Sequence, residues 1–294
     1  MSNWACLSYS TSINLGDEIQ SIAVRDQLKR YGIDLIHEID RDTSATVDSN
    51  ISCIYAGWFD GNYCSWPPRD NINPIFISFH INEEPKDASY SAIDKYLIKP
   101  SEMVSLADKS FIPYYAKYSP IYTRDLHTQR KLENSGIPAT FLGCLTMTLP
   151  SPNISPEDRS GIYMVDVETD SWKHVPNDII KKSIKLTHIT SSTNSAYKFQ
   201  QAQMLLNQYQ KAKLVITSRL HCVLPCLAYG TPVIFLLSTW ETDVRFQGLH
   251  ELMSIVGRDE IDWYNHTNKN PSKFNEMRDK LNTIAGELIQ KRIK

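Results

Sequence analysis

Apolar and polar residues alternate along the chain in short runs that predict strands and helices in turn. The apolar run 4–10 predicts a strand, and the segment 11–32 has apolar residues at helical spacing with Gly32 at the position of a C-cap. Further strands are predicted at 33–40, 51–59, 74–81 and 139–149, and further helices at 91–109 and 121–137. Because strands and helices alternate, we expect a layered α/β fold.

The segment 150–161 interrupts this pattern with three prolines and three serines, and we interpret it as a linker. After it, strands are predicted at 161–167, 185–191, 213–218 and 231–237, and helices at 177–185, 196–212 and 272–294. This predicts two Rossmann-like domains, 1–155 and 156–294, with a cleft between them. Ligands of such sheets bind beyond the carboxyl ends of the strands, so the residues that follow each strand are the candidates.

Composition narrows the function classes. The chain has 294 residues and a formal net charge of −2, which gives no reason to expect a nucleic-acid partner. Its six cysteines form no CxxC pair, so we expect no metal and a reducing compartment. We see no secretory leader and no apolar stretch long enough to cross a bilayer. We therefore expect a cytoplasmic protein, with peripheral membrane attachment left open.

The turn after the first strand carries Asn14, Gly16 and Asp17. A glycine lets the backbone approach a ligand closely, and Asn14 or Asp17 can cap the following helix, whose N-terminus favours anions. The alternative is an ordinary capped turn. After the third strand, Gly57 and Trp58 begin an aromatic-rich loop, which either stacks on sugar rings or fills an interface between domains.

His80 ends the fourth predicted strand, where it is either catalytic or structural. Arg124 and Asp125 precede a predicted helix, and the plainer interpretation is a capping Asp125 beside a solvated Arg124.

The stretch "VITSRLHCVLPCLAYGTPVIFL", 215–236, joins a buried strand to a helix. We expect Ser218 to be the N-cap and Leu220 to face the sheet. Arg219 and His221 then lie in the first turn or just before it, at the cleft. Arginine grips a carboxylate or phosphate bidentately, and histidine transfers protons near neutral pH. The alternative is a salt-bridged arginine and a core histidine. Arg245 is expected at the same rim, within a charged loop.

Four motifs, in order, resemble the polysaccharide pyruvyl transferase family. They are "NLGDEIQSIA", "AGWFDG" with "WPP" and "IFISFHI", "TRDLHTQRKLENSGI" with "FLGCLTMTL", and "TSRLH" followed by "GTP". Two features depart from the family pattern: Thr128 stands where serine is common, and "GCLTMTL" replaces the commoner "DPA" strand end.

The resemblance implies a glycosyltransferase-B-like pair of Rossmann domains. It also implies that phosphoenolpyruvate is the donor, without a cofactor, and that a glycan or a nucleotide-linked or lipid-linked sugar is the acceptor. Arg219, Arg124 and His221 match the family's donor-site residues, and His221 is our candidate acid. His80 or Asp17 is the candidate second proton carrier. Candidate substrate-binding residues are Asn14, Gly16, Asp17, Gly57, Trp58, Ser218, Leu220 and Arg245.

Two other functions stay open at this point. A glycosyltransferase that uses a nucleotide sugar would share the fold and the loop aromatics. A glycan-binding protein without catalysis would use the same cationic and aromatic rims. The sequence leaves the acceptor sugar and the oligomeric state undetermined.

Overall fold

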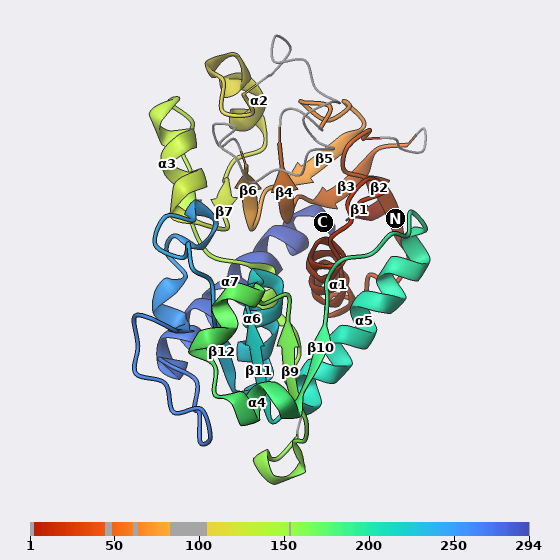
Figure 1. Cartoon of the computed structure of the whole chain (residues 1–294). Helices are drawn as coiled ribbons and strands as arrows, with labels where there is room; N and C mark the ends of the chain where they lie inside the picture. Colours follow the sequence, from red (N-terminus) through yellow and green to blue (C-terminus); the bar gives the residue numbers. More distant parts are fainter. Residues whose placement is uncertain (1–2, 45–48, 61–63, 83–104, 153, 294) are drawn as a thin grey trace.

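The computed structural model describes residues 3–44, 49–60, 64–82, 105–152 and 154–293. The chain begins with a parallel sheet in the strand order β2-β1-β3-β5. Its strands are β1 (Asn3–Ser8), β2 (Ile36–Asp40), β3 (Ile51–Ile54) and β5 (Ile72–Ile75). The fold is mixed α/β with parallel sheets, as predicted (Figure 1).

A second parallel sheet continues the first, in the order β4-β6-β7-β8. Its strands are β4 (Gly57–Phe59), β6 (Phe79–Ile81), β7 (Tyr122–Thr123) and β8 (Thr140–Phe141). The single strands predicted at 51–59 and 74–81 are therefore wrong, because each is divided between the two sheets. Ser78, with φ of +57°, breaks the second run. The apolar pattern does not reveal either break because both pieces of each run are buried.

The third sheet is also parallel, in the order β10-β9-β11-β12-β13. Its strands are β9 (Ile162–Val165), β10 (Ser183–Leu186), β11 (Leu214–Thr217), β12 (Val233–Phe235) and β13 (Ser254–Ile255). The strand predicted at 185–191 starts earlier than expected, and β10 takes the end of the predicted helix 177–185. In both halves of the chain, the carboxyl ends of the strands are the positions at which site residues were expected.

The α-helices are α1 (Gly16–Lys29), α2 (Ile112–Lys117), α3 (Leu126–Asn134), α4 (Asn177–Lys182), α5 (Ser195–Lys211), α6 (Leu220–Ala228) and α7 (Pro271–Ile293). Short 3₁₀ helices are η3 (Lys109–Phe111), η4 (Leu145–Thr148), η5 (Pro156–Asp158), η6 (Thr169–His174), η7 (Val244–Phe246) and η8 (His250–Leu252).

One further sequence prediction differs from these elements, and another cannot be compared with them. The strand predicted at 139–149 is wrong beyond β8, because the chain turns at Gly143, with φ of +100°, and forms η4. The helix predicted at 91–109 lies mostly outside the described residues.

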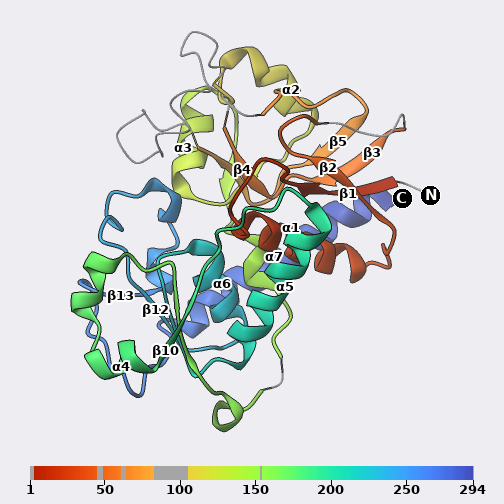
Figure 2. The ribbon, with the colours of Figure 1, turned by 45° about the vertical axis from the view of Figure 1, so that its right-hand side comes forward.

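Helices α1, α5, α6 and α7 lie between the sheets of the two halves (Figure 2). One apolar cluster contains residues from all of them, including Ile19, Leu206, Val223 and Leu281. Helix α7 starts near the third sheet and ends beside β1, so the two termini lie side by side in both views (Figures 1 and 2). The predicted boundary at residue 155 falls between η4 and β9. The division into two domains stays a prediction.

Among the described residues, no helix is both long and apolar enough to span a membrane.

Candidate functional site

The turn before α1 connects the two halves of the chain through backbone hydrogen bonds. Leu15 N donates to His188 O at 2.8 Å, and Thr190 N donates to Ile13 O at 2.8 Å. Between these two bonds, Asn14 forms an antiparallel bridge with Ile189. The start of α1 is therefore fixed against the segment that follows β10.

Asn14 and Asp17 have different parts in this turn. Asn14 Oδ1 accepts a hydrogen bond from Gly16 N at 3.1 Å. The N-cap position of α1 is occupied by Leu15 and has no side-chain cap hydrogen bond, so the predicted cap at Asn14 or Asp17 is wrong. Asp17 instead accepts from Ser12 Oγ at 2.5 Å and from Gln20 Nε2 at 3.3 Å. Burial raises the pKa of Asp17, against the opposing charges of Arg41, Lys198 and Arg124.

Gly16 packs directly against His221. A Cβ on Gly16 would lie 3.0 Å from His221 Nδ1 and 3.3 Å from His221 Cβ. The approach of a ligand to this glycine stays a prediction, and its neighbour in the structure is a candidate catalytic side chain.

His221 is buried in the first turn of α6, in an irregular conformation with φ of −81° and ψ of 16°. Its Nε2 is buried and has no hydrogen-bond partner among the described residues. Burial lowers the pKa of His221 well below 6.5, and the charges of Arg124 and Arg245 lower it further. The imidazole is therefore neutral at pH 7 when no ligand charge is nearby.

The predicted cap of α6 is wrong. Arg219, not Ser218, occupies the N-cap position, and Thr217 Oγ1 accepts from Arg219 N at 3.0 Å. Ser218 Oγ donates to Asp166 O at 2.6 Å instead. Ser218 therefore helps hold the loop after β9 against the start of α6. Leu220 is buried in the main apolar cluster, as expected.

Arg219 is paired yet still accessible. Its Nε donates to Asp166 Oδ2 at 2.9 Å, and 33% of its side chain is exposed. The same Asp166 oxygen accepts from His188 N at 2.9 Å. Burial opposes the ionised form of Asp166, but these hydrogen bonds and the charge of Arg219 lower its pKa on balance. An ionised Asp166 therefore fixes one edge of the guanidinium.

Arg124 is only 2% exposed, so the alternative of a solvated side chain is wrong. Its backbone N donates to Phe79 O at 2.9 Å, which extends the pairing of β6 with β7. Its Nε is 3.4 Å from Asp125 Oδ2 and has no hydrogen-bond partner among the described residues. Arginine remains charged even where burial lowers its pKa, so a buried cation lies at this strand end.

His80 is fully buried beside Arg124. Its Nδ1 is 2.6 Å from Asp125 Oδ2, and its buried Nε2 has no partner among the described residues. Burial and the charge of Arg124 lower the pKa of His80 to about 4, although Asp125 opposes this. Asp125 also caps α3, as predicted, because its Oδ1 accepts from Thr128 N at 2.8 Å.

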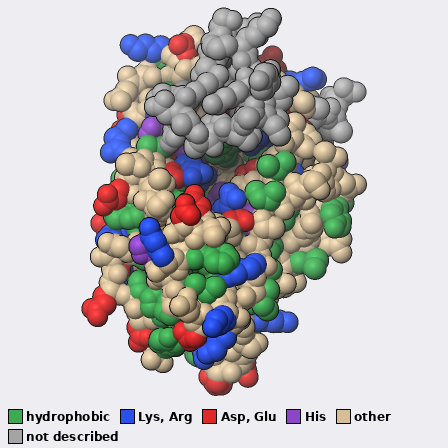
Figure 3. Space-filling model, in the orientation of Figure 1, with side chains coloured by type: hydrophobic (Ala, Val, Ile, Leu, Met, Phe, Trp, Pro, Cys, Tyr) green, Lys and Arg blue, Asp and Glu red, His purple; other side chains and the backbone are tan. Residues whose placement is uncertain are grey.

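Arg245 lies within electrostatic range of this group. It is paired with Asp243, and its side chain is 47% exposed. Its positive charge lowers the pKa values of His80, Arg124 and His221. Figure 3 shows basic, acidic and histidine side chains together in a hollow between the upper and lower parts of the molecule. The charges of Arg124 and Arg245 therefore act on both His80 and His221.

Gly57 and Trp58, in β4, contact other residues of the N-terminal half. A Cβ on Gly57 would lie 3.0 Å from Tyr9 Oη, so this glycine makes room for the core. Trp58 packs on Arg41, whose guanidinium is 5.0 Å from the ring centroid. The neighbouring aromatics Phe59, in β4, and Trp66 pack into the aromatic core of the N-terminal half and not into an interface between halves.

Sequence reasoning did not single out Arg41, Glu18 or Lys198. Arg41 is buried after β2 and paired with Asp42 at 2.7 Å. Glu18 and Lys198 form a buried ion pair at 2.9 Å between α1 and α5. The only signal for Arg41 was its place directly after a strand. Nothing local marks Glu18 and Lys198, because charged residues on amphipathic helices are usually solvated.

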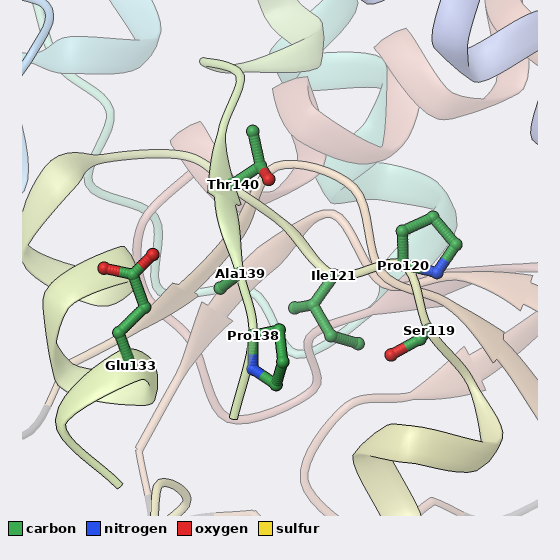
Figure 4. Close-up of a pocket in the computed structure, with 7 residues that line it drawn as sticks. All are labelled: Ser119, Pro120, Ile121, Glu133, Pro138, Ala139 and Thr140. Atoms are coloured by element: carbon green, nitrogen blue, oxygen red, sulfur yellow. The ribbon is translucent and has the colours of Figure 1, made fainter. Parts of the chain in front are cut away.

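A separate surface pocket of about 450 Å³ lies at β8, as Figure 4 shows. Its lining residues are Ser119, Pro120, Ile121, Glu133, Pro138, Ala139 and Thr140. None of the candidate site residues lines it, and it has a single charged side chain. Across the described residues, no group of three or more His, Cys, Asp or Glu side chains could hold a metal ion.

Solved structures with a similar arrangement share little sequence with this chain. An uncharacterised Klebsiella pneumoniae protein is 14% identical, with a TM-score of 0.42, and the match covers 83% of this chain and 87% of that one. The wall teichoic acid polymerase TagF is 9% identical, with a TM-score of 0.39 and coverage of 99% and 83%. A Polygonum tinctorium UDP-glucosyltransferase is also 9% identical, with a TM-score of 0.32 and coverage of 99% and 94%.

Comparison of sequences gives a definite family. No curated protein matches the chain. The family described as polysaccharide pyruvyl transferase matches residues 14–239, which is more than half of the chain and includes Gly16, His80, Arg124 and His221. The chain is therefore a transferase that belongs to the polysaccharide pyruvyl transferase family.

Proposed function

We propose that this protein transfers the enolpyruvyl group of phosphoenolpyruvate to a sugar of a glycan or glycan precursor. The product is a cyclic pyruvate ketal, and inorganic phosphate is released. One observation carries the proposal: the charge of the buried Arg124 acts on His221, and the partly exposed Arg219 precedes His221 at the start of α6. The buried Nε2 of His221 has no partner among the described residues. Phosphoenolpyruvate has both a carboxylate and a phosphate, which two fixed guanidinium groups suit.

In this mechanism His221 supplies the proton that C3 of the donor must receive. A bound donor brings negative charge next to the imidazole, which raises the pKa of His221 and favours its protonated form. Proton transfer to C3 makes C2 electrophilic, and one sugar hydroxyl attacks there while losing its proton to a base. The C2–O bond to phosphate then breaks, and a second hydroxyl closes the ketal and gives its proton to the departing phosphate.

We further propose a glycosyltransferase-B-like arrangement in which the two halves are Rossmann-like domains and the charged hollow is the cleft between them. The parallel sheets of both halves support this, because Arg124 and Arg219 follow β7 and β11 at their carboxyl ends, and His80 lies within β6. The acceptor sugar then binds on the N-terminal side and the donor against α6.

The direct test measures phosphate release from phosphoenolpyruvate with a panel of glycan acceptors and detects the added pyruvyl group by mass spectrometry. His221→Ala should reduce turnover by about 10²–10⁴-fold, the usual contribution of a general acid. Arg219→Ala should chiefly weaken capture of the donor, and Arg278→Ala on α7 is a matched control. Calorimetric binding of a nucleoside diphosphate, with none of phosphoenolpyruvate, would favour a nucleotide-sugar glycosyltransferase instead.

A further inference from the structure

The proposed donor site gives no role to the contact between His80 and Asp125. His80 Nδ1 is 2.6 Å from Asp125 Oδ2 and 3.2 Å from Thr128 Oγ1. Thr128 Oγ1 itself accepts from Ile81 N at 3.1 Å. All three side chains, His80, Asp125 and Thr128, are buried. Asp125 and Thr128, at the start of α3, thus fix the Nδ1 side of the His80 ring.

The chemistry of the pair fixes the tautomer of His80. Burial opposes the ionised form of Asp125, but its interactions with His80, the charge of Arg124 and the hydrogen bond from Thr128 N keep its pKa below the usual value. An ionised carboxylate only accepts hydrogen bonds, so Nδ1 of His80 must carry the proton. The other nitrogen, Nε2, then has a lone pair, and it has no partner among the described residues.

A purely structural histidine would not have this arrangement. Leaving a buried polar atom without a hydrogen bond costs about 1–3 kcal/mol, so buried polar groups are nearly always paired. The charges of Arg124 and Arg245 both act on His80. This is the position of a group that completes its hydrogen bonds with a substrate.

Asp17, the other candidate proton acceptor, is already engaged. One of its carboxylate oxygens accepts from Ser12 and the other from Gln20. His80 therefore has the better-placed lone pair.

We infer that Asp125 is a positioning residue that holds His80 with Nε2 as the proton acceptor for the attacking sugar hydroxyl. This inference rests on the proposed pyruvyl transfer. The hydroxyl proton moves to Nε2 while the oxygen forms its bond to C2 of the donor. Asp125 does not take up that proton, and it stabilises the imidazolium that forms.

Asp125→Asn tests the inference because asparagine can still cap α3. When the amide oxygen accepts from Thr128 N, the amide nitrogen faces His80 Nδ1 and forces the proton to Nε2. The kcat should fall by about 10²–10⁴-fold, the range of a positioned general base, while KM for phosphoenolpyruvate changes little. Asp125→Ser, which also caps a helix but has no carboxylate, should lose kcat similarly. Glu133→Gln, which replaces an exposed carboxylate on the same helix by an amide, is the matched control.

Two further readouts separate positioning from structure. Nitrogen NMR of ¹⁵N-histidine-labelled protein should show the His80 proton on Nδ1 in the wild type and on Nε2 in Asp125→Asn. In a double variant, Asp125→Asn should cost nothing beyond the loss caused by His80→Gln alone, because the two residues act as a unit.

If the wild type is active and Asp125→Asn has the same kcat, the inference is wrong while the proposed function stands. The same holds if the losses of the two single variants add in the double variant. A wild type that releases no phosphate from phosphoenolpyruvate with any acceptor would overturn the proposed function and the base role together.

Discussion

Gly16 and His221 are in van der Waals contact although 205 positions separate them in the sequence, and a methyl group on Gly16 would be only 3.0 Å from the ring nitrogen Nδ1. The first residue of α1 thus forms one wall of the place in which the imidazole sits. A glycine is required there for space and not for backbone conformation.

Gly16→Ala should therefore impair the enzyme without unfolding it. Alanine suits a helix better than glycine, but its methyl group must push the imidazole by a few tenths of an ångström. We expect kcat to fall by about 10-fold, since misplacement by 1 Å can cost about 10²-fold. Steady-state kinetics and thermal unfolding check this, with the exposed Lys29→Ala on the same helix as control. An unchanged kcat would mean that the position of His221 is not critical.

Arg124→Lys should weaken donor binding. Lysine keeps the charge but loses the planar fork that holds two anionic oxygens, and a charge-assisted hydrogen bond contributes about 1.5–3 kcal/mol. We expect the Kd for phosphoenolpyruvate to rise by about 10- to 100-fold in titration calorimetry. Arg130→Lys, on the exposed side of α3, is the matched control. Equal Kd values for Arg124→Lys and the wild type would place the donor elsewhere.

His221 should make stability depend on pH. Its folded-state pKa is lowered, so the unfolded chain binds the proton first as the pH falls below 6.5. The contribution of neutral His221 to stability is fully present above pH 6.5. It is lost as the pH falls from 6.5 toward the folded-state pKa. Relative to His221→Gln, the wild type should lose about 1.4 kcal/mol of unfolding free energy per pH unit in this window. Urea unfolding from pH 7.5 to 4.5 measures this, with the exposed His174→Gln as control. If the difference in unfolding free energy between wild type and His221→Gln does not change with pH, the pKa of His221 is not lowered by folding.

Lys198→Met should destabilise the fold strongly. Lys198 Nζ is 2.9 Å from Glu18 Oε1 and also donates to the carbonyl oxygens of Tyr9 and Ser12. Removing one partner of a buried ion pair typically costs about 3–5 kcal/mol. Urea unfolding should show this loss, whereas Lys211→Met at the exposed end of α5 should change stability by less than about 0.5 kcal/mol. The Glu18→Gln/Lys198→Met double variant should recover part of the loss, and no recovery would show that the two carbonyl contacts dominate.

Apolar spacing and capping residues correctly predicted the elements that depend on neighbouring residues in the sequence. Helix α1 followed from apolar spacing, and the cap at Asp125 followed from its place before a helix. The division of 51–59 into β3 and β4 could not be predicted, because both pieces are buried and the apolar run continues through the break.

The sequence named candidate site residues, but it did not predict the surroundings of their side chains. A sequence pattern treats an arginine after a short strand as solvated, whereas Arg124 is buried beside Asp125 and His80, the latter 44 positions away. The cap of α6 was assigned to Ser218 because serine is a good cap, yet that hydroxyl bonds to Asp166 O instead. Such partners are selected by tertiary packing, to which local propensity is blind.

The contacts of helix α7 with α1 determine how the chain would behave if it were cut into two fragments. Near its middle, Asn282 Oδ1 accepts from Gln27 at 2.7 Å and from Arg30 at 2.6 Å, both on α1. A cut within 154–161 would therefore leave two fragments that still share a core, and they would behave as complementary halves of a split protein. Neither fragment would be a sound starting point for expression alone, because each would expose an apolar surface that the other covers.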